Sequence, residues 1–293
     1  MSTEDRNPSS IIWPPRGPTH RGSEVPFGRW WQHFSRRIDS NGSRRLDKLR
    51  DSSLDIIERI PNPETWGSAP SPFNGLVVGA VQSGKTESMM AVSAMALDRG
   101  YQIIIVLTGN NESLRMQTAL RFNITLLGQS DRKIGGQWTI RDSRNRGPLG
   151  GFAPNFSLDA AGNNRLSFDI SRSFRANEPA VVVVKKEKFN LEALGGALRS
   201  LYLGSDDEPT PILVIDDECD EGSVAASPAD SYIPKAIETL WKTSSEDVRI
   251  TYIGYTATAA ANLLQDTDNP LYPRDLIYML RYPQDMDNGI RYP

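Results

Sequence analysis

The residues best suited to chemistry lie in a glycine-rich stretch, residues 79–86, which reads GAVQSGKT. This stretch fits the pattern G-x-x-x-x-G-K-[ST], which holds nucleotide phosphates when it joins a strand to a helix. Backbone N–H groups of such a loop surround a β-phosphate, and the N-terminus of the next helix attracts the same anion. The apolar run 76–78 predicts the strand, and the alanine- and methionine-rich run 87–97 predicts the helix. The sequence therefore predicts a phosphate-binding P-loop.

The side chains of this loop have separate expected roles. Lys85 is expected to reach the β- and γ-phosphates of ATP, and Thr86 to place its hydroxyl on Mg²⁺. Gln82 is expected to orient the γ-phosphate side of the loop. The other residues predicted to bind the nucleotide here are Gly79, Ser83 and Gly84. ATP and Mg²⁺ are therefore the expected cofactors.

A second group of reactive side chains follows the apolar run 211–215 and consists of Asp216, Asp217 and Glu218. A P-loop ATPase needs one carboxylate in the Mg²⁺ shell and a neighbour that polarises the attacking water. We assign Asp217 to Mg²⁺, through water, and Glu218 to the general base, so that with Lys85 they form the predicted catalytic set. Asp216 either joins the Mg²⁺ shell or ends the strand.

A third strand end carries small hydroxyl residues. The run 249–253 predicts a strand, and Thr256 and Thr258 follow it closely. Such hydroxyls can hydrogen-bond Asp220, so we expect them to border the nucleotide site and to link it to a track for nucleic acid.

Hydrophobic patterning predicts the elements that hold these groups. Near-continuous apolar runs at 102–108 and 180–184 indicate further parallel strands buried on both faces. Helices are predicted at 43–60 and 191–201. The alternating order predicts an α/β, RecA-like P-loop NTPase domain with a parallel sheet flanked by helices, preceded by an irregular or helical N-terminal extension.

Composition excludes several other classes. The net charge of −3 indicates no global affinity for a polyanion, and the single cysteine, Cys219, excludes a disulfide framework and a cysteine-rich zinc site. His20 and His33 have no ligand partners at metal spacing. No apolar run is long enough for a membrane span, and the N-terminus does not resemble a secretory signal, so a cytoplasmic protein without membrane contact is expected.

Aromatic residues outside the motifs leave two interpretations open. Trp30, Trp31 and Phe34 could anchor a partner or pack onto the chain's own core. Trp66 and Phe73, upstream of the P-loop, could stack on adenine or belong to the core.

Taken in order, the motifs resemble superfamily 2 helicases and, more closely, the Z1 domain, a helicase-like ATPase domain of bacterial proteins often labelled as endonucleases. The strings that carry this resemblance are VQSGKT, LTGN with LRMQT, VKK, VIDDECD and YIGYTAT. It covers residues from about 54 to the C-terminus, although Ala259 stands where the family tends to have proline. The resemblance implies an ATPase that acts on DNA together with other subunits of a bacterial restriction or anti-phage defence system.

Polar residues beyond two strands are the expected nucleic-acid contacts, because ligands of doubly wound sheets bind at the carboxyl ends of strands. These residues are Asn110, Arg115, Gln117, Lys185 and Lys186. A basic group in the segment 128–178 is either a nucleic-acid contact or part of a solvated insertion; it consists of Arg132, Lys133, Arg141, Arg144 and Arg146.

The expected organisation is an extension at 1–42, a first RecA-like domain at 43–270 and, at 271–293, the beginning of a linker to a second motor domain. Superfamily 2 motors take arginines from that second domain, so the resemblance implies that this chain alone hydrolyses ATP poorly. Two alternatives remain: an ATP-gated scaffold for a defence complex, docked through the Trp-rich N-terminus, and a metal-dependent endonuclease that uses residues 216–218. The sequence does not indicate the oligomeric state.

Overall fold

The structure, a computed structural model, describes residues 12–13, 27–38, 43–67, 69, 71–79, 84–126, 133–134, 137–138, 179–202, 210–224, 232–241 and 249–280. Within these residues, no helix is both long enough and apolar enough to span a bilayer.

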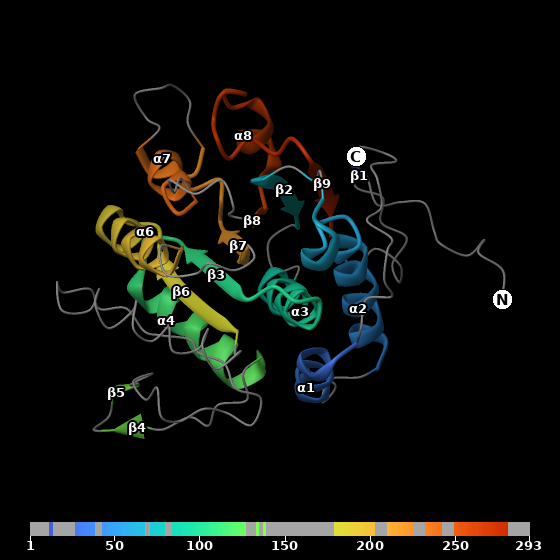
Figure 1. The fold of residues 1–293 in the computed structure, drawn as a ribbon. Coiled ribbons are helices and arrows are strands. Elements are labelled where there is room, and N and C mark those ends of the chain that lie inside the picture. Colours follow the sequence, from blue (N-terminus) through green and yellow to red (C-terminus); the bar gives the residue numbers. More distant parts are fainter. Residues whose placement is uncertain are drawn as a thin grey trace.

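A central β-sheet with helices on both sides forms the body of the described structure (Figure 1). Its strands lie in the order β1-β9-β2-β8-β7-β3-β6, and all neighbours from β9 to β6 are parallel. The strands are β1 (Ile12–Trp13), β2 (Phe73–Val78), β3 (Ile103–Thr108), β6 (Ala180–Lys185), β7 (Pro211–Asp217), β8 (Arg249–Thr256) and β9 (Leu276–Met279), with β4 (Lys133–Ile134) and β5 (Gln137–Trp138) as a separate antiparallel pair. The strand β8 lies between the P-loop strand β2 and the acidic strand β7. The predicted RecA-like α/β fold with a parallel sheet is therefore confirmed.

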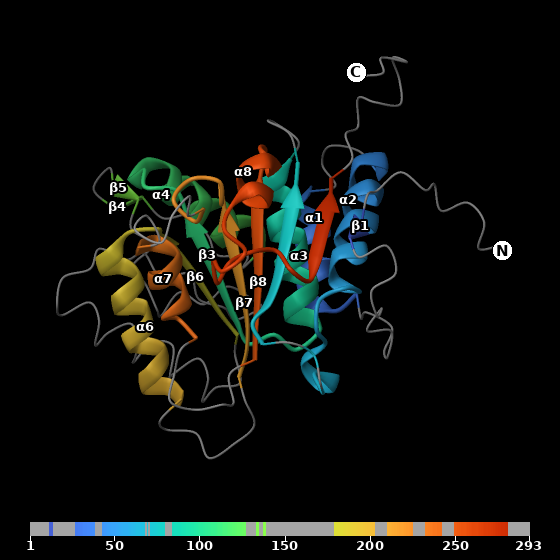
Figure 2. The ribbon, with the colours of Figure 1, turned by 90° about the horizontal axis from the view of Figure 1, so that it is seen from above.

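Helices cover both faces of this sheet. They are α1 (Arg29–Ile38), α2 (Ser43–Ile57), α3 (Lys85–Asp98), α4 (Glu112–Arg121), α6 (Lys188–Tyr202), α7 (Tyr232–Glu238) and α8 (Ala259–Leu264), with a 3-10 turn at Pro63–Thr65 and a π-helical turn at Phe122–Leu126. In Figure 1, α6 and α7 lie on one side of the sheet, and α1, α2, α3 and α4 lie on the other. Figure 2 shows that the strands from β9 to β6 run side by side and point the same way, so their carboxyl ends share one edge, whereas β1 pairs with β9 in the antiparallel direction.

The central strands are apolar on both faces because both faces are covered. Every residue of β2 and β3 is buried. Side chains such as Ile104 pack in the core cluster on the side of α3, whereas Ile105 packs in the cluster on the side of α6. This is the burial expected of parallel strands between two helical layers.

The aromatic residues with two open interpretations all belong to the core. Trp30, Trp31 and Phe34 of α1 are buried in the cluster that contains α3. Trp66 and Phe73 are buried in the same cluster, and the ring of Trp66 lies edge-on to Tyr101. Packing onto the chain's own core is therefore the interpretation that the structure confirms for all five.

The strand β9 was not predicted from the sequence. It lies beyond residue 270, where a linker was expected to begin, yet it pairs in parallel with β2 from Gly75 to Val78. Asp275 precedes it and accepts a hydrogen bond from the backbone N–H of Asn74 through Oδ2 (2.7 Å). The strand β9 thus belongs to the sheet, and the predicted domain boundaries stay predictions.

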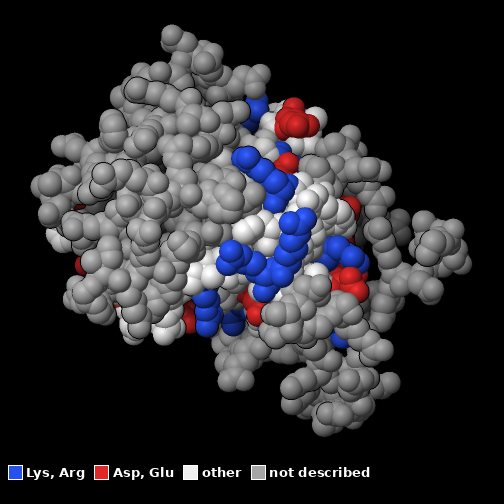
Figure 3. All heavy atoms as spheres, turned by 90° about the horizontal axis from the view of Figure 1, so that it is seen from below, with Lys and Arg blue, Asp and Glu red and all other residues white. Residues whose placement is uncertain are grey.

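The outward face of α1 is basic. Arg29, Arg36 and Arg37 are exposed, and Figure 3 shows Lys and Arg side chains gathered on the side of the molecule that is lowest in Figure 1, where α1 lies. Burial, followed by the charges of Arg37 and Arg36, lowers the pKa of His33, so this histidine is neutral at pH 7. The predicted basic group between residues 132 and 146 has its side chains outside the described residues.

The N-terminus of α1 is capped by the last residue of α3. The backbone N–H groups of Trp30 and Trp31 donate to Oδ1 (3.0 Å) and Oδ2 (2.9 Å) of Asp98. Gly28 is needed beside this carboxylate, because a Cβ at position 28 would lie 2.5 Å from Asp98 Oδ1. The first turn of a helix has unpaired N–H groups, which carboxylates stabilise. Asp98 thus ties α1 to the P-loop helix.

We predict that Asp98→Ala lowers the free energy of unfolding by about 0.5–2 kcal/mol, the usual cost of losing an N-cap. The measurement is urea unfolding followed by circular dichroism. Asp51→Ala is the control, since this carboxylate is 68% exposed and pairs with Arg50 at the surface; it should change stability by less than about 0.5 kcal/mol. Equal effects of the two changes on stability would contradict the cap that Asp98 forms at the N-terminus of α1.

Candidate nucleotide-binding site

The carboxyl ends of β2, β8 and β7 bring the predicted site residues to one edge of the sheet. β8 pairs with both neighbours, so that Val78 of β2 lies opposite Thr256, and Asp217 of β7 lies opposite Tyr255. Neighbouring strands are about 4.8 Å apart, so the ends of β2 and β7 are separated by roughly 10 Å. The P-loop and the acidic residues therefore begin on either side of the end of β8.

The P-loop leaves β2 and enters α3 as the sequence predicts. Gly84 has a φ of 79°, in the left-handed region that glycine adopts without strain, and α3 begins at Lys85. The Nζ of Lys85 donates to the carbonyl oxygen of Gly79 (3.1 Å), at the other end of the loop. Thr86 stands in the first turn of α3, whose N–H groups favour an anion. Gln82 and Ser83 lie outside the described residues, so their roles stay predictions.

The two aspartates at the end of β7 lie on opposite faces of the sheet, because successive side chains of a strand alternate. Ile215 packs in the cluster on the side of α3, and Val214 packs in the opposite cluster. Asp217 therefore shares the face of Ile215 and of the P-loop helix, whereas Asp216 shares the opposite face. Of the two, Asp217 is the aspartate on the P-loop side.

The environment of Asp217 disfavours its charge when no cation is bound. Burial, together with the charges of Glu218 and Asp216, raises the pKa of Asp217 to about 6, while Lys186 and Lys85 act in the other direction. Lys85 is the weaker of the two cations that act on the pKa of Asp217, so the two side chains interact electrostatically across the site. A cation near Asp217 would favour the ionised form.

Glu218 occupies a strained turn. Its φ of 53° lies in the left-handed region, which is uncommon for a residue other than glycine. The next residue, Cys219, donates its backbone N–H to the carbonyl oxygen of Tyr255 (3.0 Å). The carboxylate of Glu218 reaches the end of β3, because a Cβ added at Gly109 would lie 3.2 Å from Glu218 Oε2. Gly109 thus lies beside this carboxylate; the sequence indicated it only as part of the LTGN string that follows a strand.

A series of hydrogen bonds joins the P-loop to the acidic turn. The backbone N–H of Gly79 donates to the carbonyl oxygen of Thr256 (2.9 Å), and the backbone N–H of Thr258 donates to Thr256 Oγ1 (2.9 Å). The hydroxyl of Thr258 then donates to Oδ2 of Asp220. The hydrogen bond predicted between these two strand ends is therefore confirmed for Thr258, and Thr256 takes part through its backbone and side chain.

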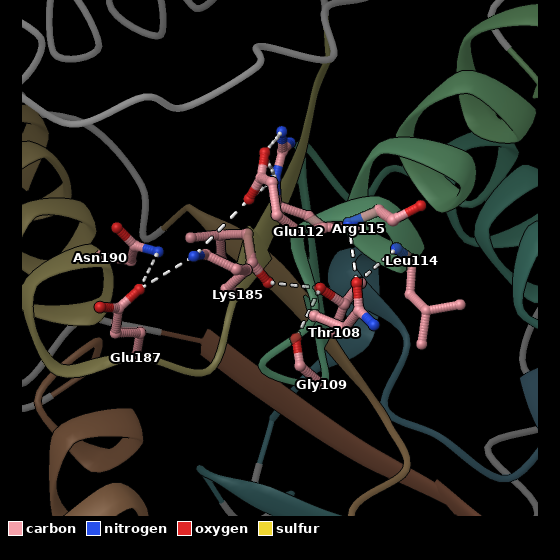
Figure 4. Close-up of polar contacts among 11 residues, drawn as sticks. Thr108, Gly109, Glu112, Leu114, Arg115, Lys185, Glu187 and Asn190 are labelled. Carbon is pink, nitrogen blue, oxygen red and sulfur yellow. Dashed lines mark hydrogen bonds and ion pairs between the residues drawn. The ribbon is translucent and has the colours of Figure 1, made fainter.

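The carboxyl ends of β3 and β6 carry a second polar group, shown in Figure 4. The side chain of Arg115 is 1% exposed and pairs with Glu112 at 2.5 Å, one turn earlier in α4. The Nζ of Lys185 lies 3.6 Å from the carboxylate of Glu112 and 3.1 Å from that of Glu187. Ion pairs between neighbouring elements thus hold this corner of the sheet.

Two of the predicted nucleic-acid contacts have buried side chains, and their role stays a prediction. Arg115 is buried and its guanidinium is engaged by Glu112, so it does not offer its charge to the surface. The side chain of Lys186 is 3% exposed and pairs with Asp216. Both were predicted from their positions after strands, which do not distinguish inward from outward side chains. Asn110 and Gln117 are exposed and Lys185 is partly exposed, so their contacts stay predictions.

Among the described residues, no group of three or more His, Cys, Asp or Glu side chains is arranged to hold a metal ion. Mg²⁺ in nucleotide sites is usually bound by one or two carboxylates together with phosphates and water, which requires no such group. The hydroxyl of Thr86 and the carboxylate of Asp217 are oxygen donors of the kind that Mg²⁺ prefers.

Gly254 lies beside the acidic turn. The sequence included it in the YIGYTAT string but predicted no role for it. A Cβ added there would lie 2.7 Å from the sulfur of Cys219, inside van der Waals contact. Asn262 of α8 donates to the carbonyl oxygen of Cys219 (3.4 Å) and approaches its sulfur (3.3 Å). The acidic turn is therefore packed directly against the backbone of β8.

We predict that Gly254→Ala lowers the free energy of unfolding by about 1–3 kcal/mol, because the new methyl group overpacks the turn. The cost should shrink in a Cys219→Ala background, where the sulfur is gone, and a double-mutant cycle in urea measures the difference. Gly196→Ala in α6 is the control: its added methyl group meets nothing nearer than 3.9 Å, and stability should stay equal or rise. Additive effects at positions 219 and 254 would contradict the contact.

Comparisons with known proteins find similarity only to solved structures, at low sequence identity. No protein-family model matches it, and no curated protein matches it. Similar solved structures include the Hef helicase domain of Pyrococcus furiosus (15% identity, TM-score 0.37), the yeast DEAD-box splicing factor Prp28 (14%, 0.38) and the ATP-dependent Type ISP restriction-modification enzyme LlaBIII bound to DNA (15%, 0.40). The matches cover 70%, 80% and 80% of this chain, but 34%, 49% and 15% of the respective solved chains. The chain thus spans about half or less of each of these proteins, and its resemblance to the Z1 domain rests on the motifs alone.

Proposed function

We propose that this chain is the first motor domain of a Z1-type, superfamily 2 ATPase, which binds ATP with Mg²⁺ and hydrolyses it. The observation that carries the proposal is the placement of Asp217 and Glu218 at the end of β7. Only the strand β8 separates β7 from the P-loop strand β2. The electrostatic effect of Lys85 on Asp217 supports a single site formed by the P-loop and the acidic turn.

The proposed roles follow from the position of each side chain. Lys85 and the backbone of the P-loop bind the phosphates, with Gly79, Gln82, Ser83 and Gly84 as the loop residues. Thr86 and Asp217 hold Mg²⁺, Asp217 through water, because both are oxygen donors at the P-loop side of the sheet. When bound, Mg²⁺ neutralises negative charge on the β- and γ-phosphates.

Glu218 is the proposed general base. Its carboxylate lies over the end of β3 beside Gly109, on the far side of Asp217 from the P-loop strand. From there it can accept a proton from a water that attacks the terminal phosphate. The hydrogen bonds from Thr258 to Asp220 and from Gly79 to Thr256 connect this turn to the P-loop, which supports the proposed role of the two threonines at the nucleotide site.

DNA is the proposed track, and other subunits of a bacterial restriction or defence system are the proposed partners. Asn110, Gln117 and Lys185 are the residues that remain candidates for the DNA contact. A second RecA-like domain, from a continuation of the chain or from a partner, would supply arginines to the ATP site, so we propose that this chain alone turns over slowly. A cytoplasmic location is part of the same proposal.

The structure does not favour the two alternatives. Asp216 lies on the opposite face from Asp217 and pairs with Lys186, so the three consecutive acids do not converge as a nuclease metal site requires. Trp30 and Trp31 are 2% and 6% exposed, so these two tryptophans of α1 do not offer their rings to a docking partner.

We predict that Glu218→Gln retains ATP binding but slows hydrolysis by about 10²–10⁴-fold, the usual contribution of a general base. Lys85→Ala should lose ATP binding itself, because it removes the phosphate-binding charge. The measurements are binding of a fluorescent ATP analogue with Mg²⁺ and phosphate release with and without DNA. Glu192→Gln on the surface of α6 is the control and should behave as the wild-type chain. A Lys85→Ala chain that still binds and hydrolyses ATP would refute the proposed site.

We predict that the double change Asn110→Ala/Gln117→Ala raises the DNA concentration for half-maximal stimulation of hydrolysis by about tenfold, as expected for losing two hydrogen bonds. Arg115→Lys is the comparison variant. Because Arg115 is buried, this change should lower the stability of the chain and leave the half-maximal DNA concentration unchanged. A titration with single- and double-stranded DNA checks this. An unchanged half-maximal concentration would remove these residues from the proposed track.

A further inference from the structure

Lys186 directs its charge into the acidic turn from the end of β6. Its Nζ lies 2.9 Å from Oδ1 of Asp216 and donates to the carbonyl oxygens of Asp217 (3.0 Å) and Glu218 (2.8 Å). Lys186 thus donates two hydrogen bonds to backbone carbonyls and forms an ion pair with Asp216. The three oxygens belong to consecutive residues at the end of β7. Lys186 therefore binds the backbone of Asp217 and Glu218, the two residues with the proposed catalytic carboxylates.

Asp216 is buried on the face away from the P-loop, where one of its oxygens accepts two hydrogen bonds. Its Oδ2 accepts hydrogen bonds from the hydroxyls of Ser223 (2.5 Å) and Tyr252 (2.6 Å). Burial and the charge of Asp216 raise the pKa of Tyr252 well above its usual value, so the phenol stays protonated and donates. With its side chain 0% exposed and Oδ1 beside Lys186, this carboxylate has the environment of a buried counter-ion.

A buried ion pair is not explained by stability alone, because the desolvation of both charges offsets much of their attraction. The geometry of the turn supplies a reason for it. Glu218 has a left-handed backbone, which costs energy in a residue with a side chain and persists only where its surroundings impose it. Lys186 binds the carbonyl of Glu218 and the carbonyl before it, which are the groups that define this conformation.

We propose that Lys186 is a positioning residue, which holds Asp217 and Glu218 in place through their backbone carbonyls, with Asp216 as its buried counter-ion and not as a metal ligand. This inference rests on the proposed ATPase function. It also assigns a role to the second lysine of the VKK string, which differs from a contact with nucleic acid.

The sequence provides a probe for the turn, because its single cysteine, Cys219, follows Glu218 directly and is 1% exposed. The test compares the wild-type chain with Lys186→Met/Asp216→Asn, which removes one charge of each sign together. Lys188→Met, two residues further along and exposed, is the matched control. Each chain is labelled with a maleimide reagent, and the rate is divided by that of the same chain unfolded in urea.

The expected result is labelling of Cys219 about tenfold faster in the double variant, as for the loss of two hydrogen bonds that close the turn. ATP affinity should stay within about threefold, while kcat with DNA falls by about 10–100-fold, the usual effect of losing a group that orients a ligand-bearing residue. Lys188→Met should match the wild-type chain in all three measurements. Unchanged labelling would overturn the proposal, and so would faster labelling with an unchanged kcat.

The labelling measurement requires no ATP, so it decides the placement of Lys186 even where the wild-type chain shows no hydrolysis and the proposed function itself fails. Should the double variant not fold by circular dichroism, Tyr252→Phe replaces it, because this change removes only one hydroxyl donor to Asp216. A smaller increase in the labelling rate of Cys219 is then expected. An unchanged labelling rate would overturn the proposal.

Discussion

The pairing of β8 with β2 on one side and β7 on the other is the constraint on which the site depends. Backbone groups of a buried strand must be hydrogen-bonded, and in a parallel sheet this fixes the register over the whole strand. The register places Val78 opposite Thr256 and Asp217 opposite Tyr255, so the P-loop and the acidic turn emerge at the same level. The roughly 10 Å between the outer strands is the width of two strand spacings and leaves room for phosphates and a hydrated cation. The spacing of the proposed catalytic groups therefore comes from the sheet and not from the loops.

The alternation of side chains along β7 then separates the carboxylates at this edge of the sheet. Asp216, Asp217 and Glu218 are consecutive, and three carboxylates so close repel one another unless cations or protons intervene. Alternation along β7 directs Asp216 to the far face, where Lys186 neutralises it, and leaves Asp217 on the P-loop side. What remains near the P-loop is a carboxylate with a raised pKa, near a lysine, in an environment that favours the arrival of a cation. With Asp216 paired with Lys186 on one face, Asp217 is the aspartate left on the P-loop side.

The sequence predicted the strands with long apolar runs, because such runs fit only a sheet covered on both faces, and it predicted the order of the motifs. It did not predict β9, since Leu276–Met279 is short and follows two nearby prolines that weaken the signal. Nor could it separate Lys185 from Lys186, as adjacent lysines after a strand look alike until the partner strand shows that only the second faces Asp216. The burial of Arg115 was equally hidden in the sequence, although Glu112 three residues earlier offered an ion pair within the helix.

The N-terminal helix α1 is linked to the nucleotide site through α3, the helix that follows the P-loop. All residues of α3 from Ser88 to Leu97 are buried, so this helix is apolar all round and must be covered on the side that faces away from the sheet. The aromatic side chains of α1 supply part of that cover, α2 supplies the rest, and Asp98 caps α1 in return. Because α3 carries Lys85 and Thr86 in its first turn, any shift of α1 and α2 would move the groups proposed to bind phosphate and Mg²⁺. The helix α1, which lies within the extension predicted at 1–42, therefore packs on the P-loop helix together with α2.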